Sequence, residues 1–346
     1  MKRPIRALVV DDSALMRRII TNILDQDAEI EVIGFARNGE DALHKIEQLK
    51  PDVVTMDVEM PVLDGLAAVK RIMSTSPVPV IMLSSLTLEG ADTTIRALEA
   101  GAVDFVTKPT IGSGVEKLAP VLTEKVKTVA TASVSREDVP SIPVKRHTIA
   151  FSKQGPISLV IIGTSTGGPS ALQQVLPKLP ANFPVPVIVI QHMPVGFTGP
   201  LAKRLHNSSK LSVKEEEAGD RLKPRWAYVA PAGRQLLVTG NVGHLSVSLK
   251  EQVDYKTLFK PSVDVTMMSA AQACGSSTLG VIMTGMGSDG TQGLRLIKEK
   301  EGLVIGQDKQ SCVVYGMPRS AFEAGVVDSV IPLDKIAYEI SRIVQK

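Results

Sequence analysis

Residues 157–169 read ISLVIIGTSTGGP, and this stretch decides the fold of the second half of the chain. It opens on an apolar run of strand length. The glycines Gly163, Gly167 and Gly168 then permit a sharp turn, and a helical pattern follows. A strand that enters a helix through such a turn is typical of a parallel α/β sheet. The turn places Ser165 at the carboxyl end of the strand, where these sheets bind their ligands.

Apolar runs alternate with helical patterns along most of the chain. We expect strands at residues 5–10, 52–56, 78–83, 103–107, 157–162, 185–190, 279–284 and 303–306. We expect helices at residues 14–26, 39–50, 114–130, 171–176, 199–205, 263–273 and 290–298. Continuous apolar strands separated by helices predict parallel sheets that are covered on both faces. Residues 211–250 are richer in short alternating pieces, at 226–230, 235–239 and 244–249. The turn at 240–243 between the last two pieces predicts an inserted β-hairpin.

The length of 346 residues favours two domains. After the helix expected at 114–130 comes a stretch of Ser, Pro and mixed charge without apolar periodicity, which predicts a linker. We therefore expect an α/β protein made of two doubly wound parallel-sheet domains. The first spans residues 1–125 and a linker spans 126–152. A larger Rossmann-like domain with the inserted hairpin spans 153–346.

The composition excludes several classes of protein. Hydrophobic residues make up 44% and charged residues 22%, an ordinary globular balance. The net charge is only +3 and aromatics are 3%, which argues against a nucleic-acid binder. No apolar run is long enough for a membrane span or a signal peptide. The two cysteines, Cys274 and Cys312, offer neither ligand spacing nor a disulfide framework, so we expect buried thiols in the cytoplasm.

Charged residues follow several strands of the first expected domain. Asp11 and Asp12 come after the first strand, Asp57 after a later one, and Lys108 after the last. Because the carboxyl ends of parallel strands meet at one edge, these carboxylates would repel one another unless a cation lies among them. Oxygen ligands suit Mg²⁺, and an aspartate can accept a phosphoryl group. The alternative is that each is an ordinary solvated carboxylate.

The combination of these motifs is more specific than any one of them. Asp11-Asp12, the segment 56–65 (MDVEMPVLDG), Ser84 and Lys108-Pro109 occur in this order. Over residues 1–125 they resemble the receiver domain of two-component response regulators. The resemblance implies a flavodoxin-like fold in which Asp57 is phosphorylated.

The same resemblance assigns a metal site and a switch. It implies that Asp11, Asp12, Asp57 and the backbone carbonyl of Glu59 surround a Mg²⁺ ion. It implies that Ser84, Phe105 and Lys108 form the conformational switch. Many receivers carry Thr and Tyr at the first two of these positions, so the switch could differ in detail. An ordinary core role for Phe105 stays open.

A serine, a histidine and an aspartate follow three strands of the second expected domain. The G-x-S-x-G pattern around Ser165 satisfies the nucleophile-elbow motif. A serine nucleophile needs a neighbouring base, and the base needs an orienting carboxylate. His192 follows the strand expected at 185–190, and Asp289 follows the strand expected at 279–284. These positions predict a Ser-His-Asp triad at one edge of the sheet.

Other interpretations of these segments stay open. The glycine-rich turn could bind a phosphate or be purely structural, although it lacks the G-x-G-x-x-G spacing and the lysine of a P-loop. Asp308 also follows a strand and is the alternative to Asp289. Asp264 is expected to interact with the dipole of its own helix. The backbone N–H groups of Thr166, Gly167 and Gly168 are candidates to bind an oxyanion.

Five segments of the second half resemble the catalytic domain of the CheB-type methylesterases of chemotaxis receptors. They are residues 163–169, 191–198, 261–264, 283–290 and 307–318, and the resemblance covers residues 153–346. It implies hydrolysis of glutamate methyl esters, deamidation of glutamines, and a supporting oxyanion contact from Met283. It also implies that the receiver domain restrains the enzyme until Asp57 is phosphorylated.

The sequence thus predicts a phosphorylation-regulated serine hydrolase. The resemblance implies methylated chemoreceptors as substrate and a histidine kinase of the CheA type as phosphodonor. We expect Mg²⁺ in the receiver, no cofactor for the ester chemistry, no nucleic-acid partner, no membrane insertion and a cytoplasmic monomer. Two rivals are a response regulator with a binding module as output, and a serine hydrolase of peptides or small esters.

Overall fold

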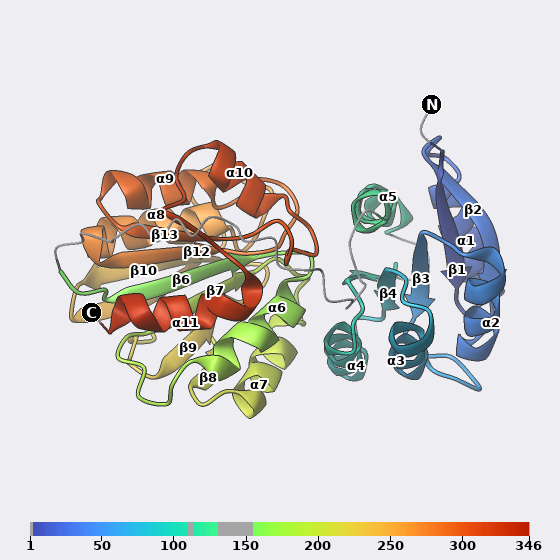
Figure 1. The fold of residues 1–346 in the computed structure, drawn as a ribbon, viewed down its shortest axis with the longest axis horizontal. Helices are drawn as coiled ribbons and strands as arrows, with labels where there is room; N and C mark the ends of the chain where they lie inside the picture. Colours follow the sequence, from blue (N-terminus) through green and yellow to red (C-terminus); the bar gives the residue numbers. More distant parts are fainter. Residues whose placement is uncertain (1–2, 110–113, 131–154, 346) are drawn as a thin grey trace. The chain divides into compact units, whose positions relative to one another are not determined.

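The computed structural model describes residues 3–109, 114–130 and 155–345. The chain divides into two compact units, Met1–Asp138 and Val139–Lys346. Each unit is built around a parallel β-sheet with helices on both faces (Figure 1). The predicted fold class is confirmed. Among the described residues, no helix is both long enough and apolar enough to cross a membrane.

The sheet of the first unit has five parallel strands in the order β2-β1-β3-β4-β5. They are β1 (Ile5–Val10), β2 (Ile30–Ala36), β3 (Val53–Asp57), β4 (Val80–Ser84) and β5 (Asp104–Thr107). One face packs against α1 (Ala14–Leu24) and α5 (Val115–Val129). The other packs against α2 (Gly39–Leu49), α3 (Gly65–Thr75) and α4 (Leu88–Glu99) (Figure 1). The strand order reverses between β1 and β3, where sheets of this order bind ligands.

The end expected for the first domain, residue 125, falls inside α5 and is too early. Helix α5 continues to Val129, and the side chains of Val126 and Val129 are wholly buried. Most of the expected linker, residues 131–152, lies outside the described residues. The sequence analysis also missed β2, an edge strand in which exposed Glu31 and half-buried residues interrupt the apolar run.

The sheet of the second unit has seven parallel strands in the order β14-β13-β12-β6-β7-β9-β8. They are β6 (Leu159–Thr164), β7 (Val187–Gln191), β8 (Ser212–Glu215), β9 (Trp226–Val229), β12 (Thr278–Ile282), β13 (Leu303–Gln307) and β14 (Ser329–Ile331). The chain enters this sheet at β6 and later crosses to β12 on the other side of it. The crevice beyond β12, β6 and β7 therefore lies at the point where ligands bind in such sheets.

Helices of the second unit form two groups, one on each face of its sheet (Figure 1). One group holds α6 (Gly168–Val175), α7 (Thr198–Ser208) and α11 (Leu333–Val344), with the short 3₁₀ helix η1 (Leu176–Lys178). The other holds α8 (Val263–Cys274), α9 (Thr291–Glu299) and α10 (Met317–Glu323), with η2 (Gly275–Ser277).

The predicted hairpin is present as β10 (Gln235–Asn241) and β11 (His244–Lys250), which pair antiparallel. It packs on α8, where the Ser269 hydroxyl accepts a hydrogen bond from the Val238 N–H at 2.9 Å. Leu236, Val238 and Leu245 join the core of the unit. Trp226–Val229, which the sequence analysis identified only as a short alternating piece, forms a parallel strand of the main sheet.

A buried carboxyl group lies directly after β8. Glu216 is 3% exposed, and its backbone N–H donates to the Val229 carbonyl at 2.9 Å. Burial raises the pKa of Glu216 to about 8, and the negative charge of Asp220 adds to the rise. The charge of Lys214 opposes this rise, but Lys214 forms its ion pair with Asp220 at 2.6 Å. Glu216 is therefore mainly protonated in the folded protein at neutral pH.

Replacing Glu216 with glutamine is expected to stabilise the second unit at neutral and alkaline pH. The pKa of Glu216 is higher in the folded chain than the unfolded value of 4.5. Glu216 therefore makes its full contribution to the free energy of unfolding only at pH values below 4.5. The contribution is lost as the pH rises towards 8. The glutamine of Glu216→Gln does not titrate. The free energy of unfolding of this variant should therefore exceed that of the wild type by an amount that grows over this range to about 1–3 kcal/mol.

Urea unfolding at pH 5 and pH 8, followed by the fluorescence of Trp226, measures this effect. Trp226 is the single tryptophan of the chain and lies in β9, so its signal reports on the second unit. Equal stabilisation at the two pH values would mean that Glu216 does not titrate as described.

Candidate functional site

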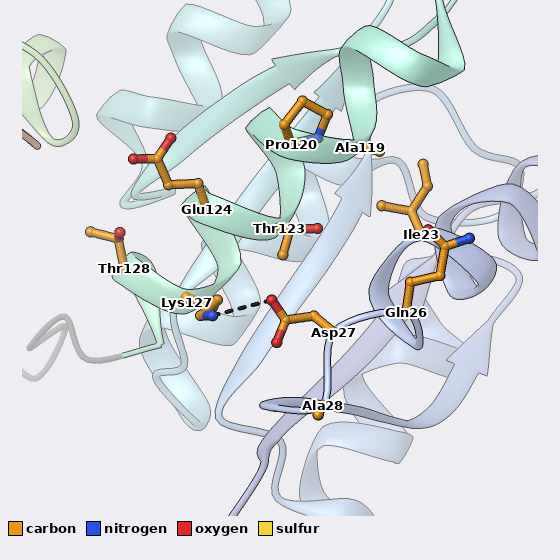
Figure 2. Close-up of a pocket in the computed structure, with 10 residues that line it drawn as sticks. All are labelled: Ile23, Gln26, Asp27, Ala28, Ala119, Pro120, Thr123, Glu124, Lys127 and Thr128. Carbon is orange, nitrogen blue, oxygen red and sulfur yellow. Dashed lines mark hydrogen bonds and ion pairs between the residues drawn. The ribbon is translucent and has the colours of Figure 1, made fainter.

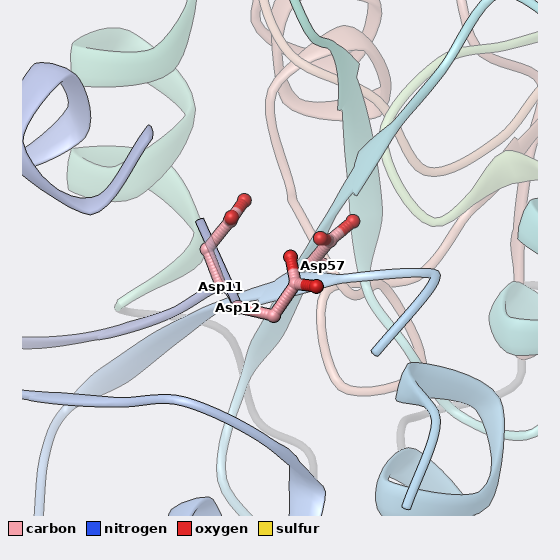
Figure 3. Close-up of side chains that lie close together, drawn as sticks. All are labelled: Asp11, Asp12 and Asp57. Carbon is pink, nitrogen blue, oxygen red and sulfur yellow. The ribbon is translucent and has the colours of Figure 1, made fainter. Parts of the chain in front are cut away.

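The acidic residues of the first unit meet at the carboxyl ends of β1 and β3. Asp11, Asp12 and Asp57 each offer a carboxylate oxygen within 4.8 Å of the others (Figure 3). A cavity of about 510 Å³ opens beside Asp12, Asp57 and Lys108, and the segment Val58–Pro61 lines its wall. Glu59 lies on this wall with an exposed side chain, and its N–H donates to Asp57 Oδ1 at 3.4 Å. The structure thus brings together the residues that the sequence placed at this site.

Lys108 neutralises only part of the negative charge in this pocket. Its ammonium lies 2.8 Å from Asp11 Oδ2 and 2.7 Å from Asp57 Oδ2. Burial alone would lower the pKa of Lys108, but its bonds to the two carboxylates raise it. Burial raises the pKa of Asp57 to about 6, the charge of Asp11 adds to this, and Lys108 opposes it. Three carboxylates against one ammonium fit a divalent cation with oxygen ligands.

Of the expected switch residues, Lys108 lines this pocket, whereas Ser84 and Phe105 are buried. Ser84 is wholly buried at the end of β4, and its hydroxyl accepts a hydrogen bond from Thr94 Oγ1 of α4 at 2.6 Å. The same hydroxyl donates to the Ser85 carbonyl at 3.1 Å. Phe105 is 3% exposed, and the Lys125 ammonium lies 5.9 Å from its ring centroid. In this structure the Ser84 hydroxyl is therefore hydrogen-bonded to α4 and to the segment that precedes α4.

Ser165 lies in the turn between β6 and α6. Its N–H donates to the Thr284 carbonyl at 3.0 Å, which ties the turn to the end of β12. Gly167 has φ = +76°, a conformation that favours glycine. Gly285 lies so close that an added Cβ would be 2.8 Å from the Ser165 Cβ. Glycines thus shape both the turn and the space against which Ser165 packs.

His192 and Asp289 form a short hydrogen-bonded pair beside this turn. His192 Nε2 lies 2.7 Å from Asp289 Oδ2, and the two side chains are 8% and 5% exposed. The other ring nitrogen, Nδ1, is buried and has no hydrogen-bond partner among the described residues. If Nε2 donates its hydrogen to the carboxylate, the neutral imidazole keeps a lone pair on Nδ1. Nδ1 is then the ring atom able to accept a proton.

Asp289 accepts further hydrogen bonds that keep it ionised. Its Oδ1 accepts from Ser262 Oγ at 2.8 Å and from the Asp264 N–H at 3.1 Å, and its Oδ2 accepts from the Val263 N–H at 2.7 Å. Burial alone would raise the pKa of Asp289, but the bonds from His192 and from these backbone groups lower it. The residues around the start of α8 therefore fix the carboxylate against the imidazole.

The alternative carboxylates do not contact His192. Asp308 accepts hydrogen bonds from the N–H of Ser311 at 3.0 Å and from its hydroxyl at 2.5 Å, within a local turn. Asp264 lies in the first turn of α8, but its Oδ1 accepts from the N–H groups of Gly290 and Gly293, at the start of α9. It therefore stabilises the neighbouring helix rather than only its own.

Two of the expected oxyanion donors are already used within the protein. The Gly168 N–H donates to the Ser165 carbonyl at 2.8 Å. The Met283 N–H donates to the Gly163 carbonyl at 3.0 Å, and the Met283 side chain is wholly buried. Thr166 is 3% exposed, and Gly167 lies beside it in the turn. The role of the Thr166 and Gly167 N–H groups as donors to an oxyanion stays a prediction from the sequence.

Two residues that the sequence analysis did not single out contact this site. The Phe259 ring stacks on the His192 imidazole, with centroids 4.1 Å apart and planes within 2°. Gln191 bonds to the backbone of both Ser165 and His192. The only sequence feature that could have indicated a role for Gln191 in the site is its position directly before His192. Phe259 lies in an irregular segment between β11 and α8, where no periodic pattern marks it.

A separate groove of about 720 Å³ lies between the end of α1 and α5 (Figure 2). Lys127 and Asp27 form an ion pair of 3.1 Å on its wall, and Pro120 lies on its α5 side. It contains none of the site residues that the sequence predicts. Its mixed wall of apolar, acidic and basic side chains favours no single class of ligand.

An acidic strand-end pocket on one parallel sheet and a His–Asp pair beside a serine turn on another define a class of protein. It is a response regulator whose receiver is joined to an α/β enzyme domain. The comparisons with known proteins agree with this class. A family model described as response regulator receiver domain matches residues 7–118, and one described as CheB methylesterase matches residues 160–340. The chain belongs to the CheB methylesterase family.

Full-length relatives and a solved structure support this assignment. A protein-glutamate methylesterase/protein-glutamine glutaminase 1 of Carboxydothermus hydrogenoformans is 47% identical, over 97% of this chain and 98% of the relative. The Lawsonia intracellularis protein of the same activity name is 46% identical over 99% of both chains. The crystal structure of the Thermotoga maritima CheB methylesterase catalytic domain matches with a TM-score of 0.53 and 44% identity. It covers 55% of this chain and 100% of that chain.

Proposed function

We propose that this chain hydrolyses glutamate methyl esters, and deamidates glutamines, on chemotaxis receptors by a Ser165-His192-Asp289 triad under the control of Asp57 phosphorylation. The single observation that carries the chemistry is the His192–Asp289 bond beside the Ser165 turn. It leaves the buried Nδ1 of His192 as the base. The names and full-length similarity of the relatives supply the substrate class.

In this mechanism Ser165 Oγ attacks the ester carbonyl while His192 Nδ1 takes its proton. Asp289 holds the ring with Nε2 protonated and stabilises the imidazolium that forms. The assignment of the nitrogens is the reverse of that in chymotrypsin-like triads, but the roles are the same. His192 then gives the proton to the leaving methoxide, and methanol departs. Water attacks the acyl-enzyme by the same route and releases a free glutamate.

Stabilisation of the tetrahedral intermediate falls to the backbone of the Ser165 turn. The donors in this proposal are the N–H groups of Thr166 and Gly167, which directly follow the nucleophile in the turn. They precede α6, so the partial positive charge of its N-terminus acts in the same direction. A glutamine side chain reacts in the same way with ammonia as the leaving group. Neither step calls for a cofactor.

Phosphorylation of Asp57 supplies the regulation. Asp11, Asp12, Asp57 and the Glu59 carbonyl would hold Mg²⁺, which when bound offsets the charge of a phosphoryl donor. Lys108 already contacts Asp57 and can pair with the new phosphoryl group. The Ser84 hydroxyl would have to leave its bond with Thr94 to reach a phosphoryl oxygen. That exchange would shift the receiver between two states. The phosphodonor in this scheme is a histidine kinase of the CheA type, and the enzyme acts as a monomer in the cytoplasm.

Deleting residues 1–140 is expected to raise basal methanol release from methylated receptor membranes. If the unphosphorylated receiver restrains the enzyme, the enzyme domain without the receiver should be active whether or not a phosphodonor is present. Couplings of this kind change activity by roughly 5- to 100-fold. The measurement compares initial rates of methanol release by the full chain and by the truncated chain at equal concentrations of folded protein.

The same truncation carrying Ser165→Ala is the control, because it shows that any extra methanol comes from the proposed site. Activity that is unchanged or lower after truncation would show that the receiver does not restrain the enzyme. The triad could then still be correct, because Ser165→Ala tests it separately.

A further inference from the structure

The side-chain amide of Gln191 lies between the two turns that carry Ser165 and His192. Gln191 is the last residue of β7 and is 2% exposed. Its Nε2 donates to the Ser165 carbonyl and to the His192 carbonyl, both at 2.9 Å. Its Oε1 accepts from Thr164 Oγ1 at 2.7 Å. Both amide hydrogens and the amide oxygen are therefore used within the site.

These bonds continue the pairing of two strands beyond the point where the strands end. Thr164 and Gln191 are paired in the parallel ladder of β6 and β7, and the His192 N–H donates to the Thr164 carbonyl at 3.1 Å. Ser165 and His192 are the next residues along each strand. The backbone ladder stops there, and the Gln191 amide is the group that joins the carbonyls of these two residues.

Gly168 provides independent evidence that the amide has a fixed place. An added Cβ on Gly168 would lie 2.0 Å from Gln191 Oε1 and 2.9 Å from Thr164 Oγ1. No side chain larger than hydrogen fits at position 168 while the amide stays there. The start of α6 is thus shaped to receive the Gln191 side chain.

We infer that Gln191 is a positioning residue, which sets the separation between the Ser165 hydroxyl and the His192 imidazole. The inference rests on the proposed function of these two residues as nucleophile and base. Its amide oxygen and both amide hydrogens are used by protein groups, so the inference gives it no direct role towards the substrate. An error of about 1 Å between reacting groups can cost about 100-fold in rate. The two donated bonds are therefore expected to act on kcat rather than on KM.

The test replaces Gln191 with methionine, which keeps the length of the side chain and removes its donors. Gln191→Met is expected to lower kcat for methanol release by about 10- to 100-fold with little change in KM. A second readout is the rate at which a fluorophosphonate labels Ser165, because that rate depends on the serine–histidine pair and not on receptor binding. It should fall in parallel with kcat.

Gln307→Met is the matched control. Gln307 is the last residue of β13 and is 1% exposed, and its amide also bonds to backbone groups, the Thr284 N–H and the Ser311 carbonyl. It makes no bond to Ser165 or His192. If the loss of any buried amide lowers stability and activity, Gln191→Met and Gln307→Met should be affected alike. We expect a similar loss of thermal stability in both but less than threefold loss of kcat in Gln307→Met.

Gln191→Glu separates the outcomes if the methionine variant does not fold. A protonated glutamic acid can donate one bond to a carbonyl and an ionised one cannot, so its labelling defect should shrink as the pH falls from 8 to 6. The inference is overturned if folded Gln191 variants are labelled at the wild-type rate, or if the two methionine variants lose kcat equally. Failure of the proposed function looks different, because wild-type protein would then show no labelling at Ser165.

Discussion

Ser165→Ala is expected to remove nearly all methanol release from methylated receptor membranes. The proposed reaction forms a bond between Ser165 Oγ and the substrate acyl carbon, and alanine leaves no nucleophile at this position. Loss of a nucleophile from a triad costs about 10⁴-fold or more, since its members act as a unit. The turn should persist, because its hydrogen bonds to Thr284 and Gly168 use backbone atoms of residue 165. The measurement is the initial rate of methanol release.

Ser170→Ala is the matched control for this substitution. Ser170 lies five residues further on, within α6, and is half-buried like Ser165. It has no place in the proposed chemistry, so its variant should keep wild-type activity. If Ser165→Ala retains more than a few per cent of the wild-type rate, Ser165 is not the nucleophile.

Asp289→Asn is expected to lower kcat by about 10³- to 10⁴-fold. Both carboxylate oxygens of Asp289 accept hydrogen bonds, Oδ2 from His192 and Val263 and Oδ1 from Ser262 and Asp264. An amide nitrogen in either position would face at least one of these N–H donors. If the amide nitrogen faces the imidazole, it donates to Nε2 and so favours the tautomer with the proton on Nδ1. That tautomer has no lone pair on Nδ1 to accept a proton from Ser165.

The same substitution should also cost about 1–3 kcal/mol in the free energy of unfolding, because a buried donor loses its acceptor. Asp264→Asn separates the two effects. Asp264 is another buried carboxylate in this network, but it bonds to Gly290, Gly293 and Tyr255 rather than to His192. We expect it to lose similar stability with a much smaller loss of kcat. Equal losses of kcat would mean that Asp289 acts through the fold and not through the imidazole.

Local signals in the sequence were enough to predict the turn at Ser165 and the sheet around it. Strand, glycines and helix are contiguous there, so the pattern is complete within one segment. Strand β8 was missed because its sequence, SVKE, is mostly polar and it lies at the edge of the sheet. Strand β9 was identified only as a short alternating piece, because nothing in its own sequence indicates parallel pairing with β7 and β8.

The contacts within the site could be predicted only in part. Asp289 and Asp308 both follow parallel strands, so the sequence favoured Asp289 but kept Asp308 as the alternative. The side-chain geometry places Asp289 against His192. Nothing in the sequence gives the ring nitrogen that faces Asp289. The Phe259 stack depends on the path of an irregular segment. Met283 was expected to support an oxyanion, but its N–H already donates to the Gly163 carbonyl at the end of β6.

The measurement that tests the central claim most directly is methanol release by wild-type protein and by Asp57→Asn, each with and without acetyl phosphate and Mg²⁺. Asparagine keeps the size of the side chain at the pocket but cannot accept a phosphoryl group. The account predicts that the phosphodonor raises the rate of the wild-type protein and leaves Asp57→Asn at its basal rate. An equal rise in both proteins, or no rise in either, would contradict the claim that phosphorylation of Asp57 controls hydrolysis at Ser165.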